Sequence, residues 1–257
     1  MSSSAPTQEA PPTPDELVRE RFVPTVVYAC EGAGFHTRLC LYNYFSEIYP
    51  DVKSGATARL WFFDQSGNMV AHRDERLGYR GQLQFDLSEL GVEFEGTAAV
   101  AMVPDTVPEF RHRGVGTGYY VFYQDDAGHA DFAHEWDAMR FEPSETHPWL
   151  CVIRPAQHPD TQIIVMNAYY GLDDRAGMAR WHIRLRASDG RSLAEREMPP
   201  LPPRGSCRVE LRELFPDFDR IWQKHATIAV EVWGTNIQGP FTRVRTPSGD
   251  FNIHHFC

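Results

Sequence analysis

The sequence lacks the long apolar run that a membrane-spanning helix needs. None of its 257 residues belongs to a run approaching the roughly 18 apolar residues of such a helix, so we expect no insertion into a membrane. Residues 1–12 have neither a basic start nor an apolar stretch, so we expect no signal peptide. Basic residues are few, because 25 Lys and Arg stand against 35 Asp and Glu, a formal net charge of −10. Phosphate contacts need a basic excess, so nucleic acid is not an expected partner.

Cysteine is also scarce. There are 5 cysteines, an odd number at wide spacing, without a Cys-x-x-Cys pair. A disulfide-stapled secreted domain would be shorter and richer in cysteine. Cys30, Cys40, Cys151 and Cys207 lie in apolar, strand-like runs, where a free thiol behaves as a small hydrophobic side chain. We therefore expect a cytoplasmic protein with free thiols.

Sequence motifs of catalysis are missing. The chain has no phosphate-binding loop of the form Gly-x-x-x-x-Gly-Lys, no Gly-x-Ser-x-Gly elbow, no His-Glu-x-x-His pair and no dinucleotide fingerprint. The most common nucleotide-dependent and hydrolytic enzyme classes are therefore not indicated.

Turn-forming and strand-forming residues are abundant instead. The chain has 19 glycines and 19 prolines, and 12% of its residues are aromatic. Residues 1–12 show no apolar period, and a capping-box pattern at Thr13 predicts a short helix over Pro14–Arg21. From Thr25 onward, short runs of Val, Tyr, Phe, Trp and Thr alternate with Gly, Pro or Asp turns, which is typical of antiparallel β-structure.

The chain matches itself at a nearly constant offset. Residues 37–45 match 161–169, and residues 80–90 match 204–214, both at an offset of 124. Three further blocks follow in the same order: 59–67 with 181–190, 97–103 with 227–233 and 118–136 with 239–257. This order predicts an internal duplication.

Each unit is long enough for one β-sandwich. About 110 residues with seven or eight strand candidates are typical of that architecture. We predict an all-β protein of two tandem antiparallel β-sandwich domains, with single helical turns after Leu87 and Leu211. The expected segments are a tail and short helix over 1–24, a first unit over 25–137, a linker over 138–148 and a second unit over 149–257. Sheet edges that need covering favour close packing of the units and a homo-oligomer.

The end of each repeat carries groups that bind transition metals. The first unit closes with His129 and His134, and the second with His254, His255 and Cys257. Imidazole and thiolate are the usual ligands of zinc and iron. His255 and Cys257 share a strand face, and His134 is the repeat equivalent of His255, so a shared metal site is one hypothesis. The alternative is that these residues pack at a domain or subunit interface.

Two further segments indicate binding. Arg111, His112 and Arg113 form a basic cluster on an inserted loop and are candidates for holding a carboxylate or phosphate of a small anionic ligand, with a solvated loop as the alternative. The aromatic run at 119–123 should be core on one side and exposed on the other. Exposed tyrosines on a sandwich bind sugars or proteins in many modules.

The block order resembles the sensory rhodopsin transducer family of small bacterial β-sandwich proteins. The resemblance lies in the strands that end at Asn43 and Asn167, the following strands with Gly or Asp turns, the Arg-Gly steps at 80–81 and 204–205, and a late strand reaching Thr242 and Arg243. It implies a non-catalytic sandwich that binds partners and self-associates. The chain departs from the family in having two units and histidine-rich repeat ends.

We therefore expect a non-catalytic, transducer-like or adaptor-like protein that binds a partner protein or a small ligand. The alternative is a metal-binding protein or metal-dependent enzyme using the histidines and cysteine at the repeat ends.

Overall fold

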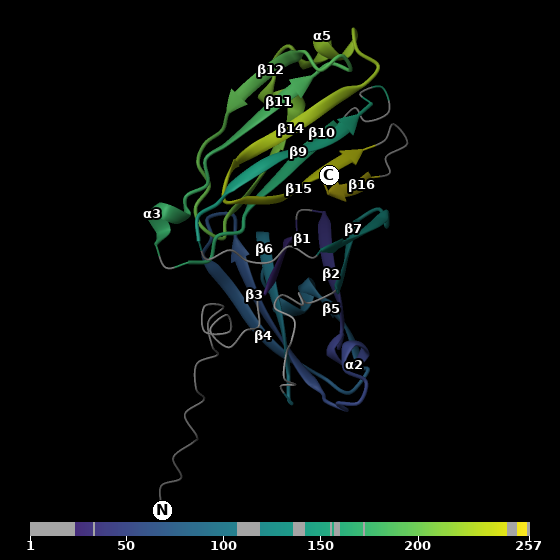
Figure 1. Cartoon of the computed structure of the whole chain (residues 1–257). Coiled ribbons are helices and arrows are strands. Elements are labelled where there is room, and N and C mark those ends of the chain that lie inside the picture. Colours follow the sequence, from purple (N-terminus) through teal and green to yellow (C-terminus); the bar gives the residue numbers. More distant parts are fainter. Residues whose placement is uncertain are drawn as a thin grey trace, which may run out of the picture.

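A computed structural model describes residues 24–32, 34–106, 119–135, 142–154, 156, 160–171, 173–245 and 251–255. The chain is all-β in these ranges, with antiparallel sheets and a few helical turns (Figure 1). No helix of this described part has both the length and the apolar character needed to cross a membrane. The helix predicted at Pro14–Arg21 lies outside the described residues.

The first half forms an eight-stranded sheet in the order β4-β3-β6-β1-β2-β7-β8, with β5 paired to β2. β1 and β2 pair only at their hairpin end, where Gly32 faces Phe35. The sheet folds back there, so that Phe62 of β3 stacks on Phe85 of β5 with ring centroids 6.0 Å apart. The elements are β1 Thr25–Gly32, β2 Phe35–Tyr42, α2 Phe45–Ile48, β3 Ala56–Asp64, β4 Met69–Leu77, β5 Gln82–Asp86, η1 Leu87–Leu90, β6 Phe94–Pro104, β7 Tyr119–Asp125 and β8 Ala130–Glu135.

The second half has two four-stranded sheets, β12-β11-β14-β9 and β13-β10-β15-β16. Side chains from both sheets share one core, for example Ile163 of β10, Trp181 of β11 and Val230 of β14. The elements are β9 Glu145–Ile153, β10 Asp160–Asn167, α3 Asp174–Gly177, β11 Trp181–Arg186, β12 Ser192–Glu197, β13 Ser206–Glu210, α4 Leu211–Leu214, α5 Phe218–Trp222, β14 Ile228–Thr235, β15 Ile237–Arg245 and β16 Phe251–His255.

The two halves have the same strand order. β4-β3-β6-β1 corresponds to β12-β11-β14-β9, and the strands β5, β2, β7 and β8 correspond to β13, β10, β15 and β16. The correspondence departs from the sequence match in one block. Phe63 pairs with Thr97 whereas Arg186 pairs with Ala229, so Ala229 rather than Thr227 takes the position of Thr97. The shift is two residues, which keeps every side chain on its face of the sheet.

A buried asparagine ends the corresponding strands β2 and β10. The Asn43 side-chain amide donates to the carbonyls of Ser54 and Gly78, at 3.0 and 2.9 Å. The Asn167 side-chain amide donates to the carbonyls of Gly177 and Leu201, at 2.7 and 3.0 Å. Each asparagine therefore joins two loops through their carbonyls, and the Gly78 and Leu201 carbonyls also accept from the backbone N–H groups of Gly81 and Ala179, each at 2.9 Å.

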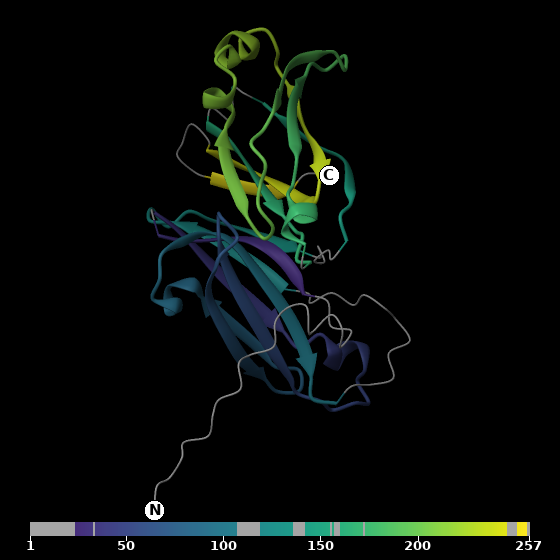
Figure 2. The same cartoon turned by 90° about the vertical axis from the view of Figure 1, so that its left-hand side faces the viewer.

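The halves pack closely, as the sequence predicted, and lie one above the other in Figures 1 and 2. Along β10, Ile163 and Val165 point into the core of the second half, whereas Ile164 and Met166 pack with the core of the first half. Because successive side chains of a strand point to opposite sides, β10 is buried on both faces. Its sheet is thus the layer that joins the two halves.

The structure differs from the sequence prediction at the linker and in the number of helical turns. β9 begins at Glu145, inside the predicted linker 138–148, and Pro148 is tolerated because β9 is an edge strand. The expected helical turns at Leu87 and Leu211 are present, but α2, α3 and α5 were not predicted. These three are single turns of four or five residues, too short to show a helical period in sequence.

Candidate binding surface

Three aromatic side chains lie exposed together on the outer side of the strands β5, β2, β7 and β8. Tyr120 and Phe122 of β7 are 53% and 39% exposed, and Phe132 of β8 is 53% exposed. The ring of Phe132 lies 6.2 Å from Tyr120 and 5.8 Å from Phe122 between centroids. These distances are those of aromatic pairs in contact. We call these three residues the aromatic face.

The alternation of β7 explains why the aromatic face points outward. Tyr119, Val121 and Tyr123 are buried, so the side chains between them must lie on the opposite side of the sheet. Core packing therefore does not require an aromatic residue at 120 or 122. A cluster of exposed rings that the core does not need is typical of an interaction surface.

The described side chains of β2 and β5 at the border of the aromatic face carry no net charge. Arg38 of β2 lies opposite Phe122 and binds both carboxylate oxygens of Asp86, at 2.5 and 3.1 Å. The side chains of Gln82 and Gln84 on β5 are exposed and neutral. The surface is thus apolar in the middle with polar groups at its edge, the usual layout of a protein interface.

The corresponding surface of the second half is covered. There, Ile164, Met166, Phe241 and Ile253 are at most 2% exposed and belong to the core of the first half. The two equivalent sheets therefore differ in their surroundings: one packs against the other half of the chain and the other is open.

Charged groups at the contact between the halves are paired. Arg208 of β13 donates to both carboxylate oxygens of Glu95 on β6, each at 2.9 Å, and the Tyr28 hydroxyl donates to the same carboxylate at 3.0 Å. Burial, together with the nearby Cys30 and Glu95, raises the pKa of Tyr28 well above its usual range. The Arg243 guanidinium lies 4.0 Å from the centre of the Phe35 ring. These contacts fix the halves in one orientation.

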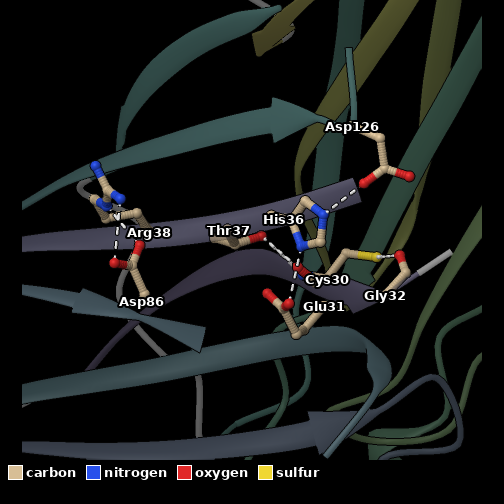
Figure 3. Close-up of polar contacts among 8 residues, drawn as sticks. All are labelled: Cys30, Glu31, Gly32, His36, Thr37, Arg38, Asp86 and Asp126. Carbon is tan, nitrogen blue, oxygen red and sulfur yellow. Dashed lines mark hydrogen bonds and ion pairs between the residues drawn. The ribbon is translucent and has the colours of Figure 1, made fainter. Parts of the chain in front are cut away.

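A histidine lies between two carboxylates at the nearby β1–β2 hairpin (Figure 3). Nδ1 of His36 is 2.8 Å from Glu31 and Nε2 is 2.9 Å from Asp126, which follows β7. The hydrogen bonds to Asp126 and then to Glu31 raise the pKa of His36. Both ring nitrogens are engaged, so the imidazolium acts as a cross-link between two turns and neither nitrogen is free to act as a base.

The thiols at the contact between the halves are poor nucleophiles. Burial and the negative charge of Glu95 raise the pKa of Cys30 to about 11 and that of Cys207 to about 12. Only the thiolate reacts, and at neutral pH both groups are protonated. The expectation of a buried, hydrophobic thiol is met by Cys30, whereas Cys40, Cys151 and Cys207 are half-buried.

Of the eight sequence-predicted site residues, four lie outside the described residues. These four are Arg111, His112, Arg113 and Cys257. His134 lies in β8 opposite Tyr120, and His254 and His255 lie in β16 opposite Thr242 and Phe241. The side chains of these three histidines fall outside the described set.

His129 has a structural contact in the β7–β8 turn. Its Nδ1 is 3.0 Å from the carboxylate of Asp125. Burial would raise the pKa of Asp125, but the hydrogen bonds from His129 outweigh it and lower that pKa. His129 therefore stabilises the turn that leads into β8.

The last strands of the two halves meet, as the metal hypothesis requires. β8 and β16 are the last strands of their sheets, and the backbone N–H of Ile253 in β16 donates to the Asp131 carboxylate of β8 at 2.8 Å. Within the described part of the chain, no group of three His, Cys, Asp or Glu side chains is arranged to hold a metal ion. The metal site remains a prediction.

Sequence reasoning found part of the aromatic face. The run at 119–123 predicted one exposed side, which is Tyr120 and Phe122, but it did not indicate Phe132. The available signal was the alternation of β8, where Phe132 stands between Asp131 and the buried Ala133. Alternation alone does not show which of the two corresponding sheets is covered by the other half of the chain.

Comparison with known proteins gives no family. No protein-family model and no curated protein sequence matches the chain. Solved structures of the exo-chitosanase CsxA of Amycolatopsis orientalis, including a complex with PNP-beta-D-glucosamine, are similar at 12% identity and a TM-score of 0.17. The match covers 79% of this chain and 24% of the exo-chitosanase chain, so the chain spans about a quarter of that protein's length.

Proposed function

We propose that the chain is a non-catalytic protein of two tandem β-sandwich units, derived by internal duplication, that works by binding a partner protein through the aromatic face. The identical strand order of the halves and their equivalent buried asparagines support the duplication. The observation that carries the binding role is the exposed cluster of Tyr120, Phe122 and Phe132. A role as adaptor or transducer would agree with the family resemblance.

The size of the aromatic face suits a moderate-affinity contact. Complete burial of one large apolar side chain contributes about 1.5–3 kcal/mol. Each ring is already about half buried in the free protein, so covering all three would contribute about 3 kcal/mol in total. A contribution of this size is typical of an interface in which a few residues supply most of the binding free energy and the surrounding contacts exclude water.

The described polar groups support a non-catalytic protein. His36 has both nitrogens bound to carboxylates, and Cys30 and Cys207 have raised thiol pKa values. Neither arrangement provides a free base or an activated nucleophile. Cys30, Cys40, Cys151 and Cys207 are free thiols, which supports a cytoplasmic location.

Hydroxyl-radical footprinting tests whether a partner covers the aromatic face. We expect oxidation of Tyr120, Phe122 and Phe132 to be slower in extract of the producing cells than in dilute purified protein. Tyr79, which is 36% exposed in the β4–β5 turn, is the matched aromatic control and should react equally in both. Equal oxidation of the aromatic face in both samples would contradict a protein-binding role and favour a small ligand elsewhere, such as an anion at Arg111, His112 and Arg113.

The contact of β8 with β16 supports a second candidate, a protein that binds zinc or iron at the repeat ends. Elemental analysis of the purified protein would then find close to one metal ion per chain, lost in the variant His255→Ala. A chain without metal, or unchanged metal content in His255→Ala, would leave these histidines as packing residues.

A further inference from the structure

The aromatic face occupies the same position in the first half as the covered surface in the second. Tyr120 lies between Cys40 and His134, and Phe241 lies between Ile164 and His255. In the next pair of positions, Phe122 lies between Arg38 and Phe132, and Arg243 between Gln162 and Ile253. The match rests on strand pairing and is independent of side-chain similarity. The aromatic face is therefore the counterpart of a surface that the protein already uses for docking.

The surface that receives the second half also has a counterpart. Tyr28 of β1 is 0% exposed and shares the Glu95 carboxylate with Arg208 of the second half, and Val26 lies two residues away on the same face of β1. Tyr28 pairs with Thr97, and Val152 of β9 pairs with Ala229, the residue equivalent to Thr97. Val152 therefore corresponds to Tyr28. By the same pairing, Leu150 corresponds to Val26.

These counterparts in the second half are open. Leu150 is 41% exposed and Val152 is 60% exposed. The chain thus presents the two complementary surfaces of its own internal contact, one on each half, and both carry exposed apolar side chains. A third unit added at either end would therefore meet, on its neighbour, the counterpart of a surface through which the two halves already contact each other.

From this repeated geometry we propose that the chain associates head to tail with further copies of itself. The aromatic face of one copy packs on the β12-β11-β14-β9 surface around Leu150 and Val152 of the next copy. The proposal rests on the proposed function and names its partner as a second copy of this chain. A contact between two different surfaces is heterologous, so it builds an open array or closes into a ring.

The charges of the two surfaces permit this contact. Around Leu150, Arg184 and Arg186 both bind Glu231, and Arg184 also binds Glu195. At the aromatic face, Arg38 is paired with Asp86. Each surface therefore carries balanced ion pairs, although the whole chain has a net charge of −10.

The contact between copies would also repeat the pairing of arginine with aromatic rings. Within the chain, Arg243 of the second half lies over Phe35 of the first half. Between copies, the first half presents Tyr120 and Phe122, and the second half presents Arg184, which already lies 4.5 Å from the centre of the Trp233 ring. Arginine stacks on aromatic faces without losing its ion pair.

Sedimentation velocity at increasing protein concentration tests the proposal. We expect the wild-type chain to reach at least twice the mass of one chain at or below roughly 1 mM, the weak end of specific association. Phe132→Lys and Val152→Lys should each remain monomeric, because each places a charge in one of the two surfaces. Val92→Lys, at a 39% exposed position in the η1–β6 loop, is the matched control and should associate like the wild type. Circular dichroism checks that all variants are folded.

Mixing the variants identifies the mode of contact. Phe132→Lys and Val152→Lys each keep one intact surface, so an equal mixture should form a dimer and no larger species. A contact between two aromatic faces would instead let Val152→Lys associate alone and leave the mixture no larger than that variant, which would overturn the proposal. A wild-type monomer up to roughly 1 mM would overturn it as well. If sedimentation contradicts self-association but footprinting in extract shows a covered aromatic face, the partner is a different protein and the proposed function stands. If footprinting in extract shows an uncovered aromatic face as well, both the self-association and the proposed function fail.

Discussion

At the residue scale, Asn167 holds three backbone segments with one side chain. Its amide nitrogen donates to Gly177 and Leu201, and its Oδ1 accepts from the backbone N–H of Tyr169 at 3.0 Å. The residue is fully buried, so water cannot replace these bonds. A buried polar group that loses its partner bears the whole cost of its desolvation.

Replacement of this asparagine should therefore be costly. We expect Asn167→Ala to lower the free energy of unfolding by about 3 kcal/mol, because three buried hydrogen bonds of its side chain are lost, to the Gly177 and Leu201 carbonyls and from the Tyr169 N–H. Asn68→Ala, at an exposed turn position, should change it by less than about 0.5 kcal/mol. Urea unfolding followed by fluorescence measures both, and an equal small effect would show that the Asn167 bonds are not required.

His36 should make stability depend on pH. Its hydrogen bonds to Asp126 and Glu31 raise its pKa in the folded protein above the unfolded value near about 6.5. The stabilisation is therefore complete below the unfolded pKa and is lost as pH rises through the folded pKa. We expect the urea midpoint to fall with rising pH above about pH 6.5, and His36→Gln to flatten this slope. Parallel pH profiles of the two proteins would contradict this assignment.

At the element scale, the β3–β4 hairpin of the first half touches the second half through Gly67. This glycine has φ +79°, and a Cβ there would lie 2.0 Å from the carbonyl oxygen of Pro203. Its counterpart Gly190 has φ +82°, and a Cβ there would meet nothing within 4 Å. Both turns therefore need a left-handed backbone at the glycine, and the turn at Gly67 also needs a close approach to the second half.

This difference predicts unequal effects of the same substitution. Gly190→Ala should cost about 1 kcal/mol, the strain of a left-handed residue. Gly67→Ala should cost about 3 kcal/mol or more, because the hairpin must also move away from the turn at 202–205. Thermal unfolding of the two variants measures the gap. Equal costs would mean that the hairpin does not contact the second half in solution.

The sequence predicted the elements better than their surroundings. Alternation and the constant offset indicated β7, β8 and their counterparts, because these patterns depend on which side of a strand is buried. They could not show that Ile164 is covered and Cys40 is half exposed, because that depends on how the halves pack. The predicted linker was too long because its prolines argue against a strand, whereas Pro148 is compatible with the edge strand β9. Arg111, His112 and Arg113 were selected by composition, and their site stays a prediction.

At the scale of the whole molecule, the two halves share part of one core. Ile164 and Met166 of the second half pack with residues of the first half, and Arg208 is bound to Glu95 across the contact. Apolar burial that spans both halves couples their unfolding, since neither half keeps its core intact when the other unfolds. The intact chain should therefore unfold in one cooperative transition.

Ile164 and Cys40 occupy equivalent positions and allow a matched test of this coupling. Ile164→Lys places an unpaired charge in the contact, so we expect the free energy of unfolding to fall by about 4 kcal/mol and the halves to unfold separately. Cys40→Lys should change stability by less than about 1 kcal/mol, because the lysine ammonium reaches solvent from the open surface. Calorimetry of dilute protein measures this as a ratio of calorimetric to van't Hoff enthalpy, about 1 for the wild type and Cys40→Lys and about 2 for Ile164→Lys. A single unshifted transition in Ile164→Lys would show that the halves do not depend on this contact.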